Sequence, residues 1–200
     1  MNLDEINSDL LKGDEVFRNG SSLLEESISD FWSWNSSNLL DNTTRGKLAE
    51  YIVGIALGCN MSKPRVDWDD YDLITINGVK VEVKSAAYIQ SWRQRFYSKI
   101  SFTIASRRQY NSASMSRNKT PHRPADIYVF ALLKHQNQST IDPMDMSQWV
   151  FYVVLTKELN KTHGLQKSIS INPLKRLSPG YQFHELKEVV SQLTQKSKSP

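Results

Sequence analysis

The sequence predicts an α/β domain in which helices flank a mixed central sheet. Three observations indicate this fold class. A segment with a broad apolar helical face spans residues 43–58, two continuous apolar runs occupy 127–133 and 149–155, and an Asn77-Gly78 dipeptide separates two short alternating runs. Continuous apolar runs of about seven residues are typical of central strands buried on both faces. Asn-Gly between alternating runs is the strongest short-range signal for a hairpin.

The length of 200 residues is typical of a single domain with one sizeable core. We therefore expect one domain over 1–200, divided into an N-terminal helical extension (1–42), a core (43–155) and a C-terminal strand and helix (156–200).

The N-terminal extension has a helical pattern over 1–19 and 21–34. Asn19-Gly20-Ser21-Ser22 separates these two segments, and Ser21 or Ser22 can cap the second helix. We expect the aromatic residues near its end to anchor the helix on the core, namely Phe31, Trp32 and Trp34.

The helix predicted over 43–58 begins at Thr43 or Thr44 and ends near Gly58. Its apolar side chains cover a broad face, so we expect it to be largely buried. One acidic residue, Glu50, lies inside it, with a glycine about one turn away on each side. These glycines, Gly46 and Gly54, could permit close helix packing or leave space beside Glu50, which could itself be a structural ion-paired carboxylate.

Beyond this helix the pattern predicts mainly strands. The expected elements are a hairpin over 73–76 and 79–84, a short helix or irregular crossing over 85–95, a strand over 100–105, a long polar loop over 106–124, the buried strands 127–133 and 149–155, an edge strand over 167–171 and an amphipathic helix over 183–193.

Composition excludes several classes of protein. No apolar run approaches the roughly 18 residues that a membrane span needs, so we expect no membrane partner. The acidic N-terminus lacks the apolar stretch of a signal peptide. Cys59 is the only cysteine, which excludes an internal disulfide and a Cys-based zinc site. A reducing cytoplasm is the expected location.

The charge is unevenly distributed. The first 41 residues contain nine acidic side chains, whereas the segment from Lys84 to Arg123 contains nine basic side chains and no acidic one. Such a segment can be an ordinary solvated loop, but its length favours a polyanionic partner. The candidates for phosphate contacts are Arg93, Arg95, Lys99, Arg107, Arg108, Arg117, Lys119 and Arg123. The four histidines show no metal-ligand spacing, and we expect Trp68 and Trp92 to pack on the core or its flank rather than to stack on bases.

A group of charged residues in the predicted hairpin has the composition of a catalytic site. Glu82 and Lys84 lie on the face of their strand opposite the valines, about 7 Å apart. Asp72 begins the partner strand. Two carboxylates about 4 Å apart repel by roughly 4 kcal/mol at an effective dielectric constant of about 20. Oxygen ligands without Cys or His suit a hard divalent cation, Mg²⁺ or Mn²⁺.

Asp72, nine intervening residues and then Glu82-Val83-Lys84 resemble the motif of the PD-(D/E)XK nuclease superfamily, which has the restriction-endonuclease-like fold. The resemblance covers about residues 43–133 and implies an α-β-β-β-α-β core. It implies that Asp72 and Glu82 bind a metal ion together with the carbonyl of Val83, and that Lys84 is the catalytic lysine.

The same resemblance gives Glu50 a role in binding the metal ion or its water, and Gln90 resembles a glutamine that some members place near the site. It implies a Mg²⁺- or Mn²⁺-dependent endonuclease of restriction, defence or repair type. The expected substrate is DNA, with double-stranded DNA preferred, and the enzyme could act as a homodimer. The sequence departs from the motif in one position, because the residue before Asp72 is Tyr71 and not the proline of the motif. Asp67, Asp69 and Asp70 are rivals of Asp72.

The hairpin poses a geometric condition for this site. A two-residue Asn77-Gly78 loop would pair Asp72 with Val83 and point Asp72 into the core, because directly opposed residues share a face. The site therefore requires a three-residue turn, a bulge, or Asp72 beyond the regular ladder. A non-catalytic nucleic-acid-binding module of the same fold and a protein-interaction domain are the alternatives to a nuclease.

Overall fold

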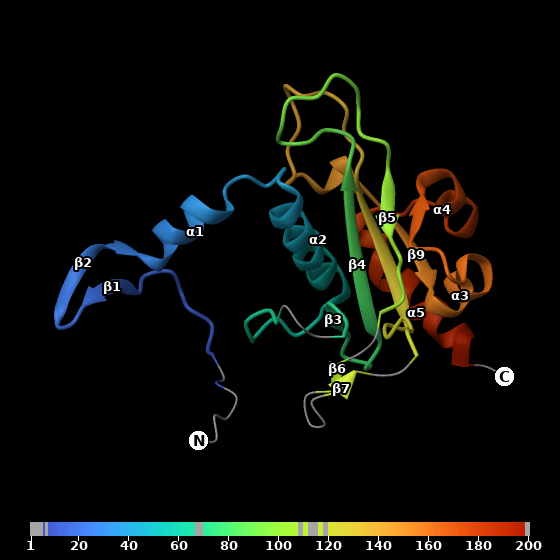
Figure 1. Cartoon of the computed structure of the whole chain (residues 1–200), viewed down its shortest axis with the longest axis horizontal. Coiled ribbons are helices and arrows are strands. Elements are labelled where there is room, and N and C mark those ends of the chain that lie inside the picture. Colours follow the sequence, from blue (N-terminus) through green and yellow to red (C-terminus); the bar gives the residue numbers. More distant parts are fainter. Residues whose placement is uncertain are drawn as a thin grey trace.

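A four-stranded mixed sheet forms the centre of the molecule. The computed structural model describes residues 6, 8–66, 70–107, 110–111, 116–117 and 120–198. The strand order is β3 (Leu73–Ile74), β4 (Lys80–Ala87), β8 (Ile127–Leu133) and β9 (Trp149–Leu155). β4 and β8 are parallel, and the other two pairs are antiparallel. The predicted mixed α/β class is confirmed (Figure 1).

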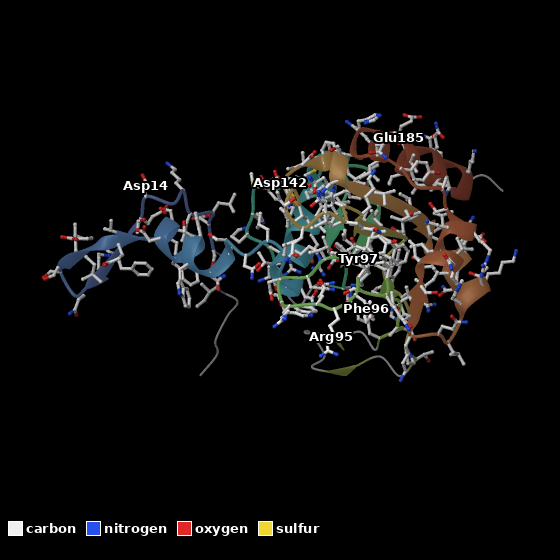
Figure 2. All side chains as sticks on the ribbon, turned by 90° about the horizontal axis from the view of Figure 1, so that it is seen from above. Asp14, Arg95, Phe96, Tyr97, Asp142 and Glu185 are labelled. Carbon is white, nitrogen blue, oxygen red and sulfur yellow. The ribbon has the colours of Figure 1, made fainter. Side chains whose placement is uncertain are left out.

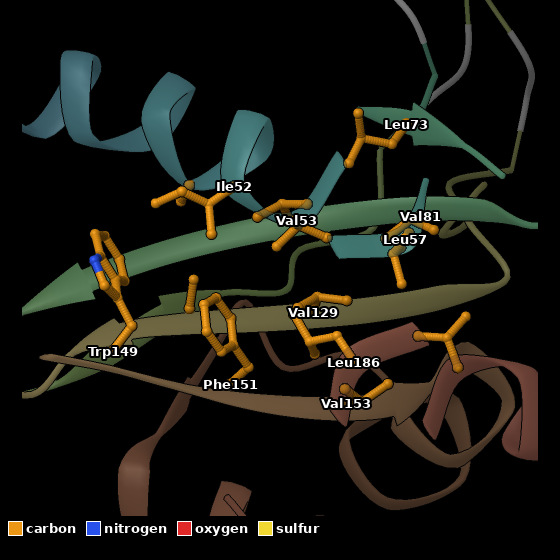
Figure 3. Packing of buried hydrophobic residues seen from close by; sticks show 14 of the residues in the cluster. Ile52, Val53, Leu57, Leu73, Val81, Val129, Trp149, Phe151, Val153 and Leu186 are labelled. Atoms are coloured by element: carbon orange, nitrogen blue, oxygen red, sulfur yellow. The ribbon is translucent and has the colours of Figure 1, made fainter. Parts of the chain in front are cut away.

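Two helices cover one face of this sheet, α2 (Asn42–Leu57) and α5 (Leu186–Lys198). Alternate residues of the strands point toward them, and Figure 3 shows the resulting packing of Ile52 and Val53 over Val81 and Val129, with Leu186 close by. The valines of β4 therefore face the core, as their period of two requires.

Shorter elements cover the other face. They are β5 (Ser101–Thr103), α3 (Thr156–His163), β10 (Ser168–Ser170) and α4 (Ile171–Leu177). Phe102 packs against Phe130 there, with a ring-centroid separation of 5.2 Å. This part of the chain also contains two 3₁₀ turns, Met146–Gln148 and Phe183–Glu185, and the short paired strands β6 (Tyr110–Asn111) and β7 (Ser116–Arg117). No helix in the described part of the chain is long and apolar enough to cross a membrane.

The strands predicted at 127–133 and 149–155 form with the expected bounds. The strand predicted at 100–105 is present as β5, but it pairs with β10 outside the central sheet. Among the described residues of 104–126 there is no helix. This part of the chain thus differs from the expected α-β-β-β-α-β order.

The prediction of two N-terminal helices is wrong. β1 (Val16–Asn19) and β2 (Ser22–Ser27) form an antiparallel hairpin, and α1 (Ile28–Ser36) follows directly. Gly20 allows the tight turn because it adopts a φ of +62°, which a side chain disfavours. The helix begins only after Ser27, whose backbone N–H donates to the Asp30 carboxylate at 2.7 Å in a capping box.

The expectation that aromatic residues anchor this helix on the core is also wrong. The hairpin and α1 project away from the central sheet, as the position of Asp14 in Figure 2 shows. Phe31 is 41%, Trp32 40% and Trp34 83% exposed.

α2 confirms the predicted helix with one correction at its start. Asp41 is the N-cap rather than Thr43 or Thr44, because its carboxylate accepts hydrogen bonds from the backbone N–H groups of both threonines. Gly58 ends the helix at a φ of +67°.

Candidate active site

The turn between β3 and β4 sets the register of the candidate site. Thr75 donates its backbone N–H to the carbonyl of Val79 at 3.0 Å, so three residues, Ile76-Asn77-Gly78, form the loop between them. The side-chain hydroxyl of Thr75 accepts the N–H of Val79 at 3.1 Å, and Gly78 has a φ of +77°. The hairpin therefore meets the geometric condition through a three-residue turn, one of the predicted alternatives.

This turn brings Asp72 and Glu82 to the same face. Leu73 pairs with Val81 in the ladder, and extending that register by one residue sets Asp72 opposite Glu82. The carboxylate of Asp72 accepts the backbone N–H of Val83 at 2.7 Å, which fixes it against β4. Asp72 therefore lies beside Glu82 and Lys84 rather than in the apolar core.

Glu82 is a buried carboxylate with two cationic partners. It is only 3% exposed. Lys84 Nζ lies 2.6 Å from its Oε1 and Arg107 Nη2 lies 3.0 Å from its Oε2. Burial raises the pKa of Glu82, and the negative charge of Asp72 raises it further. The negative charges of Asp72 and Glu82 thus repel each other within the site.

Glu50 lies near the same group but is paired elsewhere. Its carboxylate forms an ion pair with Arg65, whose Nη2 is 2.9 Å from Oε1. Burial raises the pKa of Glu50, and the charges of Asp72 and Lys84 both act on it. Glu50 therefore affects the electrostatics of the site. Its carboxylate is ion-paired, which is one of the two interpretations that the sequence left open.

A pocket of about 410 Å³ opens beside Glu50 and Asp72, between α2, residues 59–66 and β3. Three basic side chains also line it, Lys47, Lys63 and Arg65. The sequence analysis missed all three, because they lie outside the acid-free segment. Lys47 alone had a usable signal, since it lies one helical turn before Glu50. Of the two flanking glycines, Gly54 packs against the side chain of Met61, whereas a Cβ on Gly46 would meet open space.

The donor set that a metal ion would use consists of oxygen atoms only. Within the described ranges, no group of three or more His, Cys, Asp or Glu side chains is placed to hold a metal ion. Asp72 and Glu82 provide two carboxylates, and Val83 adds a backbone carbonyl on the same strand. Two carboxylates with few further protein ligands suit Mg²⁺, which keeps several waters. Asp67 and Asp69 lie outside the described residues, and Asp70 contributes a carbonyl that accepts from Arg107 at 2.8 Å.

Gln90 lies in a hydrogen-bond network just beyond β4. It is buried, and its side chain accepts from Arg45 Nη1 at 3.0 Å and donates to the carbonyl of Ala87 at 2.8 Å and to Ser98 Oγ at 3.1 Å. These contacts support the chain that follows β4. Its amide is thus occupied within this network.

The predicted phosphate contacts fall into separate groups. Arg93, Arg95 and Lys99 are exposed on the loop 88–99. Arg107 faces Glu82. For Arg117 the structure describes only the backbone, in β7, and Arg108 and Lys119 lie outside the described residues.

Arg123 is a correction. It is buried, and its guanidinium donates to the carbonyl of Ile104 at 2.7 Å and to Asn160 Oδ1 at 2.6 Å. Because these groups occupy it in the interior, the expectation that it contacts phosphate is wrong.

Comparison with known proteins identifies a family and a solved structure that are similar to this chain. The family described as bacteriophage T4 endonuclease IV matches residues 14–173. A solved structure titled as that of a bacterial homing endonuclease, I-Ssp6803I, is 19% identical, with a TM-score of 0.39, and the match covers 78% of this chain and 94% of that chain. No curated protein matches the sequence.

Proposed function

Because the chain belongs to the bacteriophage T4 endonuclease IV family, we propose that it is a divalent-metal-dependent endonuclease that hydrolyses DNA phosphodiester bonds. The observation that carries this proposal is the position of Asp72 opposite Glu82, with the Lys84 ammonium group 2.6 Å from the Glu82 carboxylate. We further propose that these residues form a site of the PD-(D/E)XK type.

The electrostatics of the two carboxylates support a cation at this site. The pKa of Glu82 is raised because burial and the charge of Asp72 both disfavour its anionic form. A divalent cation between them would relieve that repulsion, and Asp72, Glu82 and the Val83 carbonyl are the groups that would hold it. When bound, Mg²⁺ or Mn²⁺ would neutralise charge on a phosphate oxygen and lower the pKa of a bound water.

The protein's own cations have distinct parts in this proposal. The side chain of Lys84 is 28% exposed, so a phosphate can approach it from solvent. Its ammonium group would position the attacking water and stabilise the charge on the pentavalent phosphorus. Hydrolysis would add the water oxygen to phosphorus and its proton to the departing 3′ oxygen, which would leave a 5′-phosphate.

Glu50 and Arg65 complete the proposed site on the α2 side. Arg65 neutralises Glu50 in the present arrangement. A phosphate in the neighbouring pocket would attract Arg65, together with Lys47 and Lys63, and so release Glu50 to accept a hydrogen bond from water. Glu50 would then act beside a bound metal ion, through its water, without being a permanent ligand.

A plasmid assay tests the proposal. Supercoiled DNA is incubated with Mg²⁺, Mn²⁺ or EDTA, using the wild-type chain and the Glu82→Ala and Lys84→Ala variants. Glu188→Ala and Lys187→Ala are matched controls, because both are exposed charges on α5. Branched and single-stranded DNA belong in the panel. A homodimer with two sites would produce linear plasmid directly, whereas a single site would first produce nicked circles.

Loss of cleavage in EDTA and in both site variants, with full activity of the controls, supports the proposal. Salt-sensitive DNA binding without any cleavage would instead support the non-catalytic nucleic-acid-binding module. Neither binding nor cleavage would support the protein-interaction domain.

A further inference from the structure

The N-terminal arm, residues 8–36, leaves its apolar side chains in solvent. It contains the β1–β2 hairpin and α1, which project away from the central sheet (Figure 1), and Gly13 is the only buried residue in this described range. Leu23 is 67% and Trp34 83% exposed. The other exposed large apolar side chains of the arm include Phe17, Leu24, Phe31 and Trp32. So much exposed apolar surface on a folded segment indicates a site at which another protein binds.

Hydrogen bonds join the parts of the arm and hold it outward. The backbone N–H of Ile28 donates to the carbonyl of Glu15 at 2.8 Å, which connects α1 to the hairpin. At the other end, the carbonyl of Leu40 accepts a hydrogen bond from the buried Arg45 at 2.8 Å, and the Asp41 carboxylate caps α2. The connection between the arm and α2 is therefore fixed to the core. The arm points away from its own chain and is available to a second molecule.

The charge of the arm is opposite to that of the rest of the chain. Residues 1–41 carry nine acidic and two basic side chains, a net charge of −7, and the whole chain carries +4, so residues 42–200 carry +11. Within the arm, Glu25 and Glu26 are exposed on β2. Because every copy of the chain carries both charges, the arm of one copy is attracted to the core of another.

The core has a matching surface on the outer side of α2. Lys47, Tyr51 and Ile55 follow one another at intervals of four residues, so they share one side of the helix, where Tyr51 is 53% and Ile55 52% exposed. The core patch comprises Tyr51, Ile55, Met61, Val66 and Ile74. Except for Ile55, these residues line the pocket of the candidate active site, together with Lys47 and Lys63. The core patch is thus apolar with a basic edge, which complements an arm that is apolar and acidic.

We propose that the arm of one copy docks on the core patch of a second copy, and that the exchange is reciprocal and forms a two-fold symmetric dimer. Apolar side chains such as Leu23 and Trp34 would cover the core patch, while acidic side chains of the arm face Lys47 and Lys63. A segment of this length provides about the 20–30 residues that one side of a stable interface needs. Reciprocal exchange closes the assembly at two copies and leaves no arm unpaired.

The docked arm would also cover the pocket beside Glu50 and Asp72. If the proposed function holds, phosphates of DNA enter this pocket, so the arm and DNA exclude each other. The dimer is then a resting form of the enzyme, which DNA converts to the active form by displacing the arm. Only this consequence rests on the proposed function, because the dimer itself depends on the arm and the core patch alone.

Light scattering after gel filtration measures the dimer in EDTA and without DNA. Trp34→Ser in the arm and Tyr51→Ser in the core patch should each raise the Kd of the dimer about a hundredfold, because an aromatic contact contributes about tenfold and the exchange contains it twice. Phe96→Ser is the matched control, since Phe96 is 86% exposed on the loop 88–99, and it should leave the Kd unchanged. Trp92 on the same loop is 52% exposed, so the expectation that it packs on the core or its flank is wrong.

Charge reversal shows whether the arm and the core patch meet between chains. One variant carries Glu25→Lys with Glu26→Lys in the arm, and a second carries Lys47→Glu with Lys63→Glu at the core patch. Each variant alone should be a monomer, because its arm and core patch now have the same sign. A mixture of the two should form a heterodimer, because both of its contacts are again between opposite charges. Glu188→Lys with Lys187→Glu on α5 is the control and should dimerise like the wild type.

A wild-type chain that remains monomeric at 100-fold the concentration used for cleavage, on the order of 100 μM, would overturn the proposal. A dimer unchanged by Trp34→Ser and Tyr51→Ser, with native circular dichroism, would overturn it as well, and so would a mixture of charge-reversed chains that stays monomeric.

Anisotropy of labelled DNA in EDTA tests the consequence for the active site. Trp34→Ser should bind DNA more tightly than the wild type at concentrations where the wild type is a dimer. If the dimer behaves as expected but the two DNA affinities are equal, the proposed phosphate pocket fails while the arm exchange remains.

Discussion

Asp72 lies opposite Glu82 across the β3–β4 ladder, although Asn77-Gly78 alone would have placed it opposite Val83. One additional residue in the turn, Ile76, shifts the pairing and moves Asp72 from the core face to the face of Lys84. The second carboxylate of the candidate site thus depends on the geometry of a three-residue loop, and the predictions below begin from this hairpin.

Glu82→Gln should stabilise the protein at pH 7 in EDTA. The raised pKa of Glu82 means that its anion is less favourable in the folded than in the unfolded chain. Wild-type stability therefore falls as the pH rises from the ordinary glutamate range through the folded-state pKa. We expect a gain of roughly 0.5–2 kcal/mol at pH 7, which shrinks below pH 4. Urea denaturation measures it, with Glu188→Gln as the control. A less stable Glu82→Gln protein at pH 7 would contradict this account.

Tyr128→Phe should remove part of the loss of stability at alkaline pH. Tyr128 is directly paired with Glu82 on the neighbouring strand. Burial first, and then the charge of Glu82, raise the pKa of Tyr128 to about 12. The neutral hydroxyl of Tyr128 contributes fully to the free energy of unfolding below about pH 10, and this contribution is lost as the pH rises toward 12. Between pH 9 and 11.5 the free energy of unfolding, measured by denaturation, should fall less for Tyr128→Phe than for the wild type, by up to about 2 kcal/mol. Identical slopes would show that Tyr128 ionises as freely as in the unfolded chain.

Gly78→Ala should destabilise the hairpin turn. Gly78 has a φ of +77°, a conformation that costs an alanine about 1–2 kcal/mol. Gly46→Ala is the matched comparison, since it lies inside α2 with open space around its Cβ position. It should increase stability by roughly 0.5–1 kcal/mol. Thermal unfolding of both variants checks these opposite signs, and a neutral Gly78→Ala would mean that the turn has another conformation.

Gln90→Ala should affect stability and not the chemical step. Removing the amide takes away one of the two acceptors of the buried Arg45 Nη1, the other being the carbonyl of Leu40, and it also removes the bonds to Ala87 and Ser98. We expect these losses to cost about 1–3 kcal/mol. DNA binding should weaken because the loop 88–99 loses its support. The single-turnover cleavage rate at saturating DNA should stay at the wild-type value. A large fall in that rate, with stability unchanged, would return Gln90 to the catalytic group.

The parts of the fold that the sequence predicts well are those in which a local pattern determines burial. The continuous apolar runs of β8 and β9 have the expected bounds because strands buried on both faces leave no alternation. The prediction of two helices in the N-terminal segment is wrong because the turn at Gly20 and the capping box at Ser27 favour a hairpin and a later helix start. The exposed aromatic residues of this segment, Phe31, Trp32 and Trp34, have the sequence pattern of a helix face that packs on a core.

The ionic contacts of the candidate site could not be predicted in the same way. The spacing of Asp72, Glu82 and Lys84 is visible along one hairpin. The partners Arg65 and Arg107 come from segments whose approach depends on the tertiary fold. Arg123 could not be predicted for the same reason. It belongs to the basic segment, but it is buried and donates hydrogen bonds to the carbonyl of Ile104 and to Asn160.

The central claim is that Asp72 and Glu82 together hold a divalent cation at the site of hydrolysis. Anomalous scattering from crystals of the wild-type chain soaked with Mn²⁺ tests it most directly. We predict a manganese peak in contact with oxygens of both carboxylates, at about 2.0–2.2 Å, and its loss in Asp72→Asn crystals. Crystals that cleave bound DNA in saturating Mn²⁺ but have no manganese at Asp72 and Glu82 would contradict the account.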